Sequence, residues 1–223
     1  MLKKVLDRLK QLSVEPVPFD PSILDDPVAT QAEWGPAKGG GASFGTHKVE
    51  AVDSFRLEFR PTGGALFFYG IFLVVGLLTF FGAGIAAMTA GVGLEGSARL
   101  GLLIPVIVGL VFSVVGGALM RRGSAPIVFD KRRGAYWRGR VAPHEMSNRH
   151  GHEHMAELED VHALQLISEL CTSKDSRYYS YELNLVLRDG RRMNVVDHGN
   201  HVSIREQADT LSAFLEVPVW DAT

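Results

Sequence analysis

Two long uncharged runs constrain the fold of this chain more than any other feature of its sequence. Residues 65–89 contain no charged side chain in 25 positions, and residues 100–120 contain none in 21. A helix needs about 20 apolar residues to cross a bilayer core, where its backbone must satisfy its own hydrogen bonds. Both runs are apolar on all sides, whereas a soluble helix of this length keeps a polar face. The sequence therefore predicts two transmembrane helices that form a membrane hairpin.

Cationic residues predict the orientation of this hairpin. They precede the first run and follow the second, whereas the connecting loop, residues 90–99, holds one arginine and one glutamate. The flanking cations are Lys48, Arg56, Arg60, Arg121, Arg122, Lys131, Arg132 and Arg133. Because cytoplasmic flanks carry the excess of Lys and Arg, both termini are expected in the cytoplasm and the loop outside. The expected location is a plasma membrane, namely a bacterial inner membrane, and composition alone is also compatible with a eukaryotic membrane.

The two runs also favour some membrane functions over others. Neither run contains an ionisable side chain, and a transporter or a proton pathway usually needs one. Small residues let membrane helices approach closely. The glycines in the runs are Gly70, Gly76, Gly82, Gly84, Gly101, Gly109, Gly116 and Gly117. Packing within the hairpin accounts for them without a dimer, although a homo-oligomer is also compatible with them.

Three segments precede the first run. Residues 1–12 alternate apolar and basic residues with helical spacing, which predicts an amphipathic helix that lies on a membrane surface or docks on the protein. Residues 13–45 contain five prolines and a KGGG run and are expected to form an irregular linker. Residues 46–61 alternate apolar and charged side chains and predict a β-hairpin that turns at Asp53 and Ser54.

Residues 123–223 are expected to form a β-rich domain that ends in a helix. The expected strands are 126–130, 135–140, 160–167, 179–187 and 191–197. The segment 179–187 has one predicted buried face. Its apolar residues Tyr181, Leu183, Leu185 and Leu187 alternate with Glu182, Asn184 and Val186. The final helix is expected at 203–216, with Ser203 as its N-cap and Glu206 completing a capping box.

The hairpin at 46–61 needs a larger sheet, because an isolated two-stranded hairpin is marginal in water. The only candidate is the sheet formed after the second transmembrane run, and the predicted orientation puts both on one side of the membrane. We therefore expect one cytoplasmic domain of α+β class with seven strands and a C-terminal helix. The membrane hairpin is an insertion between its second and third strands.

This order resembles the bacterial membrane proteins that pair transmembrane hairpins with pleckstrin-homology-like domains. The resemblance rests on the hairpin, on "IVFDKRRGAYWRGR" (127–140), on "LEDVHALQLI" (158–167), on "YELNLVLRDGRRMNVVDHG" (181–199) and on the capped helix. The segment "WGPAKGGGASFGTHKVE" (34–50) resembles the lead-in of a group of proteobacterial two-span proteins. The resemblance to pleckstrin-homology-like domains implies a seven-stranded β-barrel or sandwich closed by a C-terminal helix. It implies no catalytic residue.

A basic and aromatic cluster follows the second run and is the first candidate site. Its members are Lys131, Arg132, Arg133, Tyr136, Trp137, Arg138 and Arg140. Juxtamembrane cations attract anionic headgroups, at about 1 kcal/mol each. The same residues are equally compatible with a role in topology alone. A net charge of −2 and the lack of a recognised module argue against nucleic acid.

A second candidate is the histidine-rich segment that contains His150, His152 and His154, since imidazoles bind zinc, nickel or copper. The same pattern also fits a solvated loop. The segment 195–201 brings Asp197, His198 and His201 close to Ser203, but no G-x-S-x-G nucleophile turn is present. We therefore expect no enzyme activity and no cofactor.

The function expected from these features is non-enzymatic. A transmembrane hairpin would hold a cytoplasmic pleckstrin-homology-like domain at the bilayer, where it binds a protein partner or anionic lipid headgroups in an assembly, scaffold or regulatory role. Two alternatives remain open. One is a membrane sensor that binds a metal ion through the histidine-rich segment, and the other is an immunity protein that protects the membrane from a toxin.

Overall fold

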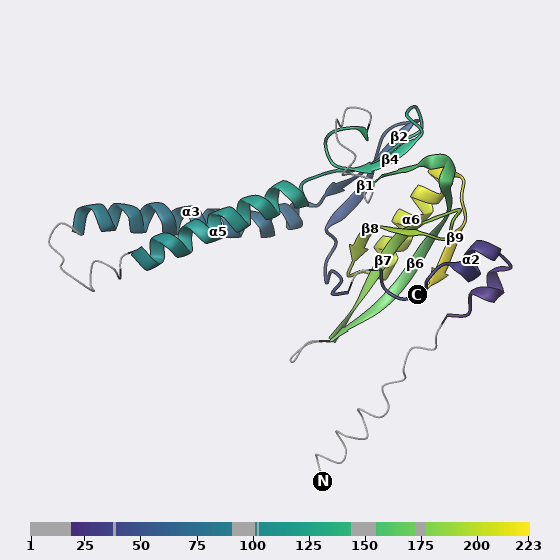
Figure 1. Ribbon diagram of the computed structural model, residues 1–223, viewed down its shortest axis with the longest axis horizontal. Coiled ribbons are helices and arrows are strands. Elements are labelled where there is room, and N and C mark those ends of the chain that lie inside the picture. The colour runs from purple at the N-terminus through teal and green to yellow at the C-terminus, as the bar shows by residue number, and fades with distance from the viewer. Residues whose placement is uncertain (1–18, 38, 91–100, 102, 144–154, 173–176) are drawn as a thin grey trace, which may run out of the picture.

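The computed structural model describes residues 19–37, 39–90, 101, 103–143, 155–172 and 177–223. A long helical hairpin projects from a body of two β-sheets and short helices (Figure 1). Three predicted features lie outside the described residues. They are the amphipathic helix at 1–12, nearly all of the external loop at 90–99, and the histidines His150, His152 and His154.

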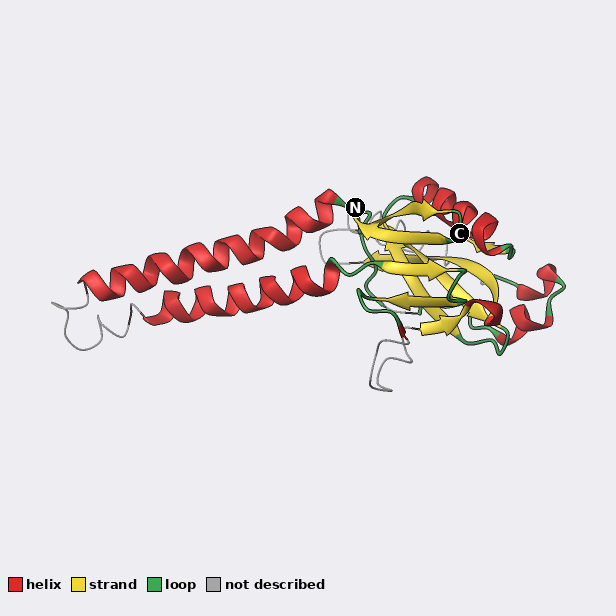
Figure 2. Cartoon of the chain, turned by 90° about the horizontal axis from the view of Figure 1, so that it is seen from above, coloured by secondary structure: helices red, strands yellow, loops and turns green. Residues whose placement is uncertain are grey.

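The hairpin consists of α3 (Gly63–Ala90) and α5 (Leu103–Gly123), which have 28 and 21 residues. At about 1.5 Å per residue, both exceed the roughly 30 Å of a bilayer core. Only 6 % and 11 % of their most apolar stretches are buried inside the protein, so neither is the core helix of a soluble domain. In Figure 2 the two helices run side by side away from the sheets. Both are long and apolar enough to span a membrane.

Three glycines bring the two helices together. They are Gly76 of α3 and Gly109 and Gly116 of α5, and a Cβ atom at any of them would collide with the backbone of the opposite helix. By contrast, a Cβ at Gly82 or Gly117 would meet nothing within 4 Å. Helix pairing thus requires some of the glycines in the runs but not others.

The first sheet contains strands from the chain before α3 and from the chain after α5. Its strands, in spatial order, are β1 (His47–Asp53), β2 (Arg56–Pro61), β3 (Ile127–Asp130), β4 (Ala135–Arg138) and β5 (Met155–Glu157). All neighbours are antiparallel. The strand that leads into α3 is β2, and the strand that follows α5 is β3. They pair directly, with Phe59 opposite Ile127. The chain therefore enters and leaves the hairpin from adjacent strands of one sheet.

The second sheet is built from the C-terminal part of the chain. Its order is β8 (Arg192–His198), β7 (Arg177–Leu187), β6 (Val161–Thr172) and β9 (Val219–Ala222). The helix α6 (His201–Leu215) follows β8 and leads to β9, which pairs parallel to β6. The described residues thus form two sheets of five and four strands, whereas seven strands were expected. The extra strands β5 and β9 are short and owe their conformation to distant partners rather than to local pattern.

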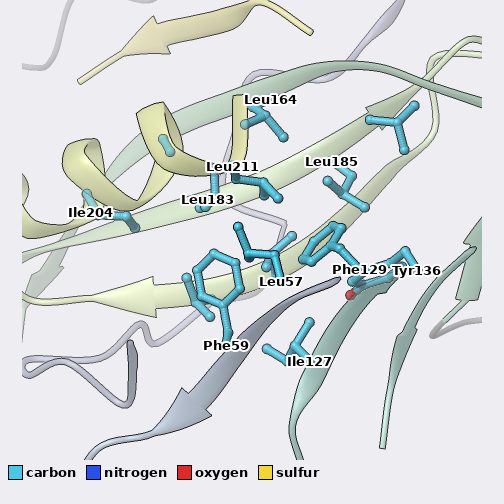
Figure 3. Close-up of a cluster of buried hydrophobic side chains, with 14 of the residues drawn as sticks. Leu57, Phe59, Ile127, Phe129, Tyr136, Leu164, Leu183, Leu185, Ile204 and Leu211 are labelled. Carbon is cyan, nitrogen blue, oxygen red and sulfur yellow. The ribbon is translucent and has the colours of Figure 1, made fainter. Parts of the chain in front are cut away.

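The hydrophobic core lies between the two sheets, and α6 contributes to it. In Figure 3, Leu57, Phe59 and Phe129 of the first sheet point toward leucines of the second sheet. The fully buried core side chains labelled there are Leu57, Phe59, Ile127, Phe129, Tyr136, Leu164, Leu183, Leu185, Ile204 and Leu211. Residues before and after the helical hairpin therefore share one core.

The N-terminus of α6 differs from the prediction. Asn200 is the N-cap, and its Oδ1 accepts a hydrogen bond of 2.9 Å from the backbone N–H of Ser203. The prediction that Ser203 caps the helix is wrong, because asparagine is an equally good N-cap and stands three residues earlier. The helix consequently begins at His201, and Glu216 ends it in a left-handed conformation with φ of 62°.

The predicted irregular linker is more ordered than expected. It contains the 3₁₀ helix η1 (Pro21–Leu24) and the short helix α2 (Pro27–Gln31). Ala29 of α2 is buried in a second apolar cluster with Val186 and Trp220 of the second sheet. The linker prediction overlooked this contact, because the apolar residues concerned are few and their partner sheet is more than a hundred positions away.

The rest of this segment, residues 33–37 and 39–45, forms a strap over the outer face of the second sheet. The backbone N–H of Ala37 donates to Glu182 Oε2 at 2.9 Å, and the Tyr178 hydroxyl donates to the Gly41 carbonyl at 3.1 Å. Glu182 and Asn184 of β7 are consequently buried, although they lie on the face that was expected to meet water. Both faces of β7 are therefore covered.

Candidate functional site

The structure divides the basic cluster that the sequence predicted. The strand β3 carries the chain away from α5, and β4 returns toward it. At about 3.3 Å per residue, Asp130 lies roughly 10 Å along the strand from Ile127. Lys131, Arg132 and Arg133, which we call the distal cations, therefore occupy the turn remote from the helices. Arg138 and Arg140 lie at the opposite end, beside the base of the hairpin.

Each distal cation has an acidic partner. Three nitrogen–oxygen distances define the pairs: Lys131 Nζ to Glu216 Oε1 is 3.3 Å, Arg132 Nη1 to Asp53 Oδ2 is 2.9 Å, and Arg133 Nη1 to Asp130 Oδ2 is 3.7 Å. These carboxylates offset the positive charge of the turn. The distal cations are thus a weak candidate for attracting an anionic surface.

The two aromatic members of the predicted cluster are buried. Tyr136 and Trp137 are 1 % and 3 % exposed. Tyr136 belongs to the main core, where its ring lies 4.9 Å from that of Phe129. Trp137 packs in a separate cluster, and the guanidinium of Arg56 lies 5.6 Å from the centre of its ring. Neither ring is available to lipid or to a partner.

A cavity of about 360 Å³ lies where the helical hairpin joins the first sheet, and we call it the junction cavity. It is lined by Thr46, His47, Tyr69, Leu119, Arg122, Gly123, Ala125 and Arg138. These residues come from Thr46 and the start of β1, from α3, from the end of α5 with the connection that follows it, and from the end of β4. The ring of Tyr69 packs directly over Gly123, where any Cβ would collide with it. Four separate segments of the chain therefore meet at this cavity.

Hydrogen bonds hold two arginines beside the cavity. Arg138 Nη2 donates to the Val195 carbonyl at 2.6 Å, which links the two sheets. Arg140 Nη2 donates to Ser124 Oγ at 2.6 Å, and its Nη1 donates to the Arg121 carbonyl at 3.4 Å. Within the part of the chain that the structure describes, neither arginine forms an ion pair with a carboxylate. Their positive charge is therefore not offset as it is at the distal cations.

Two further arginines, Arg121 and Arg122, occupy the exposed last turn of α5. Cations at a helix C-terminus interact favourably with the helix dipole. Together with Arg138 and Arg140 they form a group that we call the junction arginines. The sequence pattern treated Arg121 and Arg122 only as a topology signal. It could not show that Arg122 shares a cavity with Arg138, because the two residues lie on different elements.

His47 is the only histidine among the described lining residues of the junction cavity. Its Nδ1 lies 3.0 Å from the hydroxyl of Thr46. Burial, followed by the nearby charge of Arg138, lowers the pKa of His47 to about 4. The imidazole is therefore neutral at neutral pH.

This lowered pKa predicts a pH dependence of stability. The unfolded chain takes up a proton at His47 near pH 6.5, whereas the folded chain does so only near pH 4. The contribution of the neutral imidazole is present above pH 6.5 and is lost as the pH falls through this window. We expect His47→Gln to remove on the order of 2 kcal/mol from the difference in unfolding free energy between pH 7 and pH 4.5. Equal differences for the two proteins in denaturant titrations would contradict this expectation.

Other candidate residues have structural partners or lie outside the described residues. His198 Nδ1 accepts from the backbone N–H of Asn200 at 2.8 Å, and His201 Nε2 lies 2.7 Å from the Thr223 hydroxyl. The described residues contain no group of three or more His, Cys, Asp or Glu side chains that could hold a metal ion. The predicted metal ligands His150, His152 and His154 are not among them. The junction cavity and the junction arginines thus form the strongest candidate site.

Comparisons with known proteins do not point to another site. No protein-family model and no curated protein matched the chain.

Proposed function

We propose that this chain is a non-enzymatic integral membrane protein that holds a pleckstrin-homology-like domain against the cytoplasmic face of a plasma membrane. The junction arginines engage anionic lipid headgroups and fix the domain on the bilayer surface. The observation that carries this proposal is the direct pairing of β2 with β3, the two strands that enter and leave the hairpin. A domain attached in this way cannot turn independently of its membrane anchor.

The connections between sheet and helices are short. Only Thr62 separates β2 from α3, and residues 124–126 separate α5 from β3. Thr62 is fixed by two hydrogen bonds to the segment before β1. Its backbone N–H donates to the Thr46 carbonyl at 2.9 Å, and its hydroxyl donates to the Gly45 carbonyl at 2.8 Å. Neither connection is long enough to act as a flexible linker. The sheet therefore keeps a constant orientation relative to the helices.

The pleckstrin-homology-like assignment is supported by strand order. The first sheet is an antiparallel meander, β6 to β8 form a second one, and a helix follows directly. That helix inserts Ile204, Ala208 and Leu211 into the core between the sheets. The short strand β5 and the parallel strand β9 depart from the expected seven-stranded pattern.

Charge favours lipid as the binding partner. The excess of cations on the flanks predicts a cytoplasmic domain, and the cytoplasmic leaflet is the anionic one. The junction arginines border the base of the helices, so they come to the level at which the hydrocarbon core ends. At about 1 kcal/mol per cation near such a surface, they supply a useful attraction before screening by salt. The distal cations are paired with acids and contribute little.

This proposal predicts that anionic lipid stabilises the domain. The full chain is reconstituted in nanodiscs of phosphatidylcholine with or without phosphatidylglycerol, and unfolding of the β-sheets is followed by circular dichroism. We expect a higher melting temperature with phosphatidylglycerol, by roughly 2–4 °C for each kcal/mol gained. The gain should shrink at high salt because the arginines are exposed. Identical melting in the two bilayers would refute the proposal.

A further inference from the structure

We propose that the junction cavity binds the phosphate group of one anionic membrane lipid, with Arg122 and Arg138 as its ligands. This inference rests on the proposed function, and it adds a defined stoichiometric site to a general surface attraction.

The cavity has the size and lining of a binding site. Its volume of about 360 Å³ lies within the range of roughly 300–1,000 Å³ that is typical of small-molecule sites. One part of its wall is polar, with Thr46, His47 and two guanidinium groups. Another part is apolar, with Leu119 and the ring of Tyr69. An amphiphilic ligand fits such a wall better than a fully polar one.

The charge of the lining selects an anion. Arg122 and Arg138 approach from different elements, α5 and β4, and no acidic residue is among the described residues that line the cavity. Guanidinium groups present planar pairs of N–H donors that match phosphate oxygens. The distal cations of the same domain provide an internal contrast, because each has a carboxylate within 4 Å. Among the described residues, no carboxylate forms such an ion pair with Arg122 or Arg138 at the junction cavity.

The position of the cavity favours a lipid over a free phosphate ion. Leu119 lines the cavity and is also 37 % exposed on the outer surface of α5. The apolar wall therefore continues onto the surface of the hairpin, where acyl chains pack when the helices lie in a bilayer. A lipid can place its phosphate between the arginines while its chains follow α5. A free phosphate would gain only the polar contacts.

Neighbouring arginines allow a matched test. Arg121 and Arg122 are adjacent, exposed and in the same turn of α5, but only Arg122 lines the cavity. Arg121→Gln and Arg122→Gln remove the same charge from the same flank, so they affect membrane topology and general attraction equally. Among the described residues it is Arg138, and not Arg122, that donates the hydrogen bond to the Val195 carbonyl and links the two sheets, so Arg122→Gln leaves that hydrogen bond in place.

The full chain is purified in a neutral detergent and titrated with phosphatidylglycerol, and bound lipid is counted by native mass spectrometry. We expect one tightly retained lipid on the parent chain, and for Arg121→Gln only the smaller loss of affinity that follows from a weaker general attraction. For Arg122→Gln we expect an affinity lower by about tenfold or more, as for loss of a hydrogen bond to a charged group. In a parallel titration, inorganic phosphate should not compete at concentrations that saturate the lipid site.

Each outcome discriminates between the two proposals. Equal retention by Arg121→Gln and Arg122→Gln would overturn the cavity site, although stabilisation of all three proteins by anionic nanodiscs would still support the general attraction. Effective competition by inorganic phosphate would overturn the assignment to a lipid and indicate a soluble phosphate site. Failure of phosphatidylglycerol both to bind and to stabilise the parent chain would overturn the proposed function together with this inference.

Discussion

Residues 123–223 made on their own are expected to remain unfolded, even though they contain seven of the nine described strands. This fragment lacks β1 and β2, and with them Leu57 and Phe59, which are 2 % and 0 % exposed in the shared core. Removing a buried leucine or phenylalanine side chain costs about 2–5 kcal/mol. The two losses together approach the roughly 5–15 kcal/mol by which a whole domain is stable. The strand β3 would also lose β2, one of its two hydrogen-bonded neighbours, and become an open edge.

A second variant provides the matched control. In it, residues 62–125 are replaced by a short glycine-containing turn that joins β2 directly to β3. Because these strands are antiparallel neighbours, a tight turn can connect them. We expect this variant to fold as a water-soluble domain with a cooperative melting transition and a dispersed amide NMR spectrum. The fragment 123–223 should show neither property.

A cooperative transition of the fragment alone would contradict the shared core. Failure of the joined variant, with success of the intact chain in detergent, would show instead that the helices are needed for folding as well as for anchoring. Addition of residues 46–61 as a separate peptide tests the same contact. We expect the peptide to restore structure to the fragment, because β2 supplies the missing core side chains.

The second large effect is expected in the helical hairpin. In Gly109→Ala, the added methyl group would collide with the backbone of α3 at Phe80. Backbone cannot move aside as a flexible side chain can, so the helices must separate. Overpacking of this kind costs about 1–3 kcal/mol, and a collision with backbone falls at the upper end. The variant is expected to lose hairpin stability in titrations with sodium dodecyl sulfate followed by circular dichroism.

Gly117→Ala is the control in the same helix. A Cβ there meets nothing within 4 Å, so no collision follows. Alanine is a better helix former than glycine by roughly 0.5–1 kcal/mol, and the control is therefore expected to be neutral or slightly stabilised. Opposite signs for the two variants would support the close approach at Gly109. Equal effects in both variants would contradict it.

Local patterns carried much of the architecture. Length and lack of charge indicated the two helices, because crossing a bilayer depends on the run of residues itself and not on distant contacts. Alternation within 46–61 and 179–187 likewise indicated strands, which β1, β2 and β7 now occupy. The close contacts at Gly76 and Gly116 agree with the expected packing within the hairpin. The helices and strands themselves depend on neighbours in sequence, whereas the contacts at these glycines depend on the pairing of the two helices.

The candidate site did not follow from local pattern. Arg133 and Arg138 stand five positions apart, and the sequence put them in one basic cluster. The β3–β4 hairpin places them at opposite ends of two strands, where one lies beside an acid and the other beside a cavity. No sequence pattern linked His47 or Tyr69 to these arginines, because His47 lies on β1 and Tyr69 on α3. Proximity in sequence was a poor guide to proximity in space.

The amino-acid order by itself determined the two long apolar helices, the helix α6 and most of the strands, because hydrophobic length and periodicity act over a few turns or a few residues. Only the tertiary structure decided that the strap buries the outer face of β7, that Trp220 pairs in a parallel strand, and that Arg122 meets Arg138. These features depend on contacts between residues far apart in the chain. These contacts contribute their stabilising free energy only when the two sheets have packed together and the core has formed.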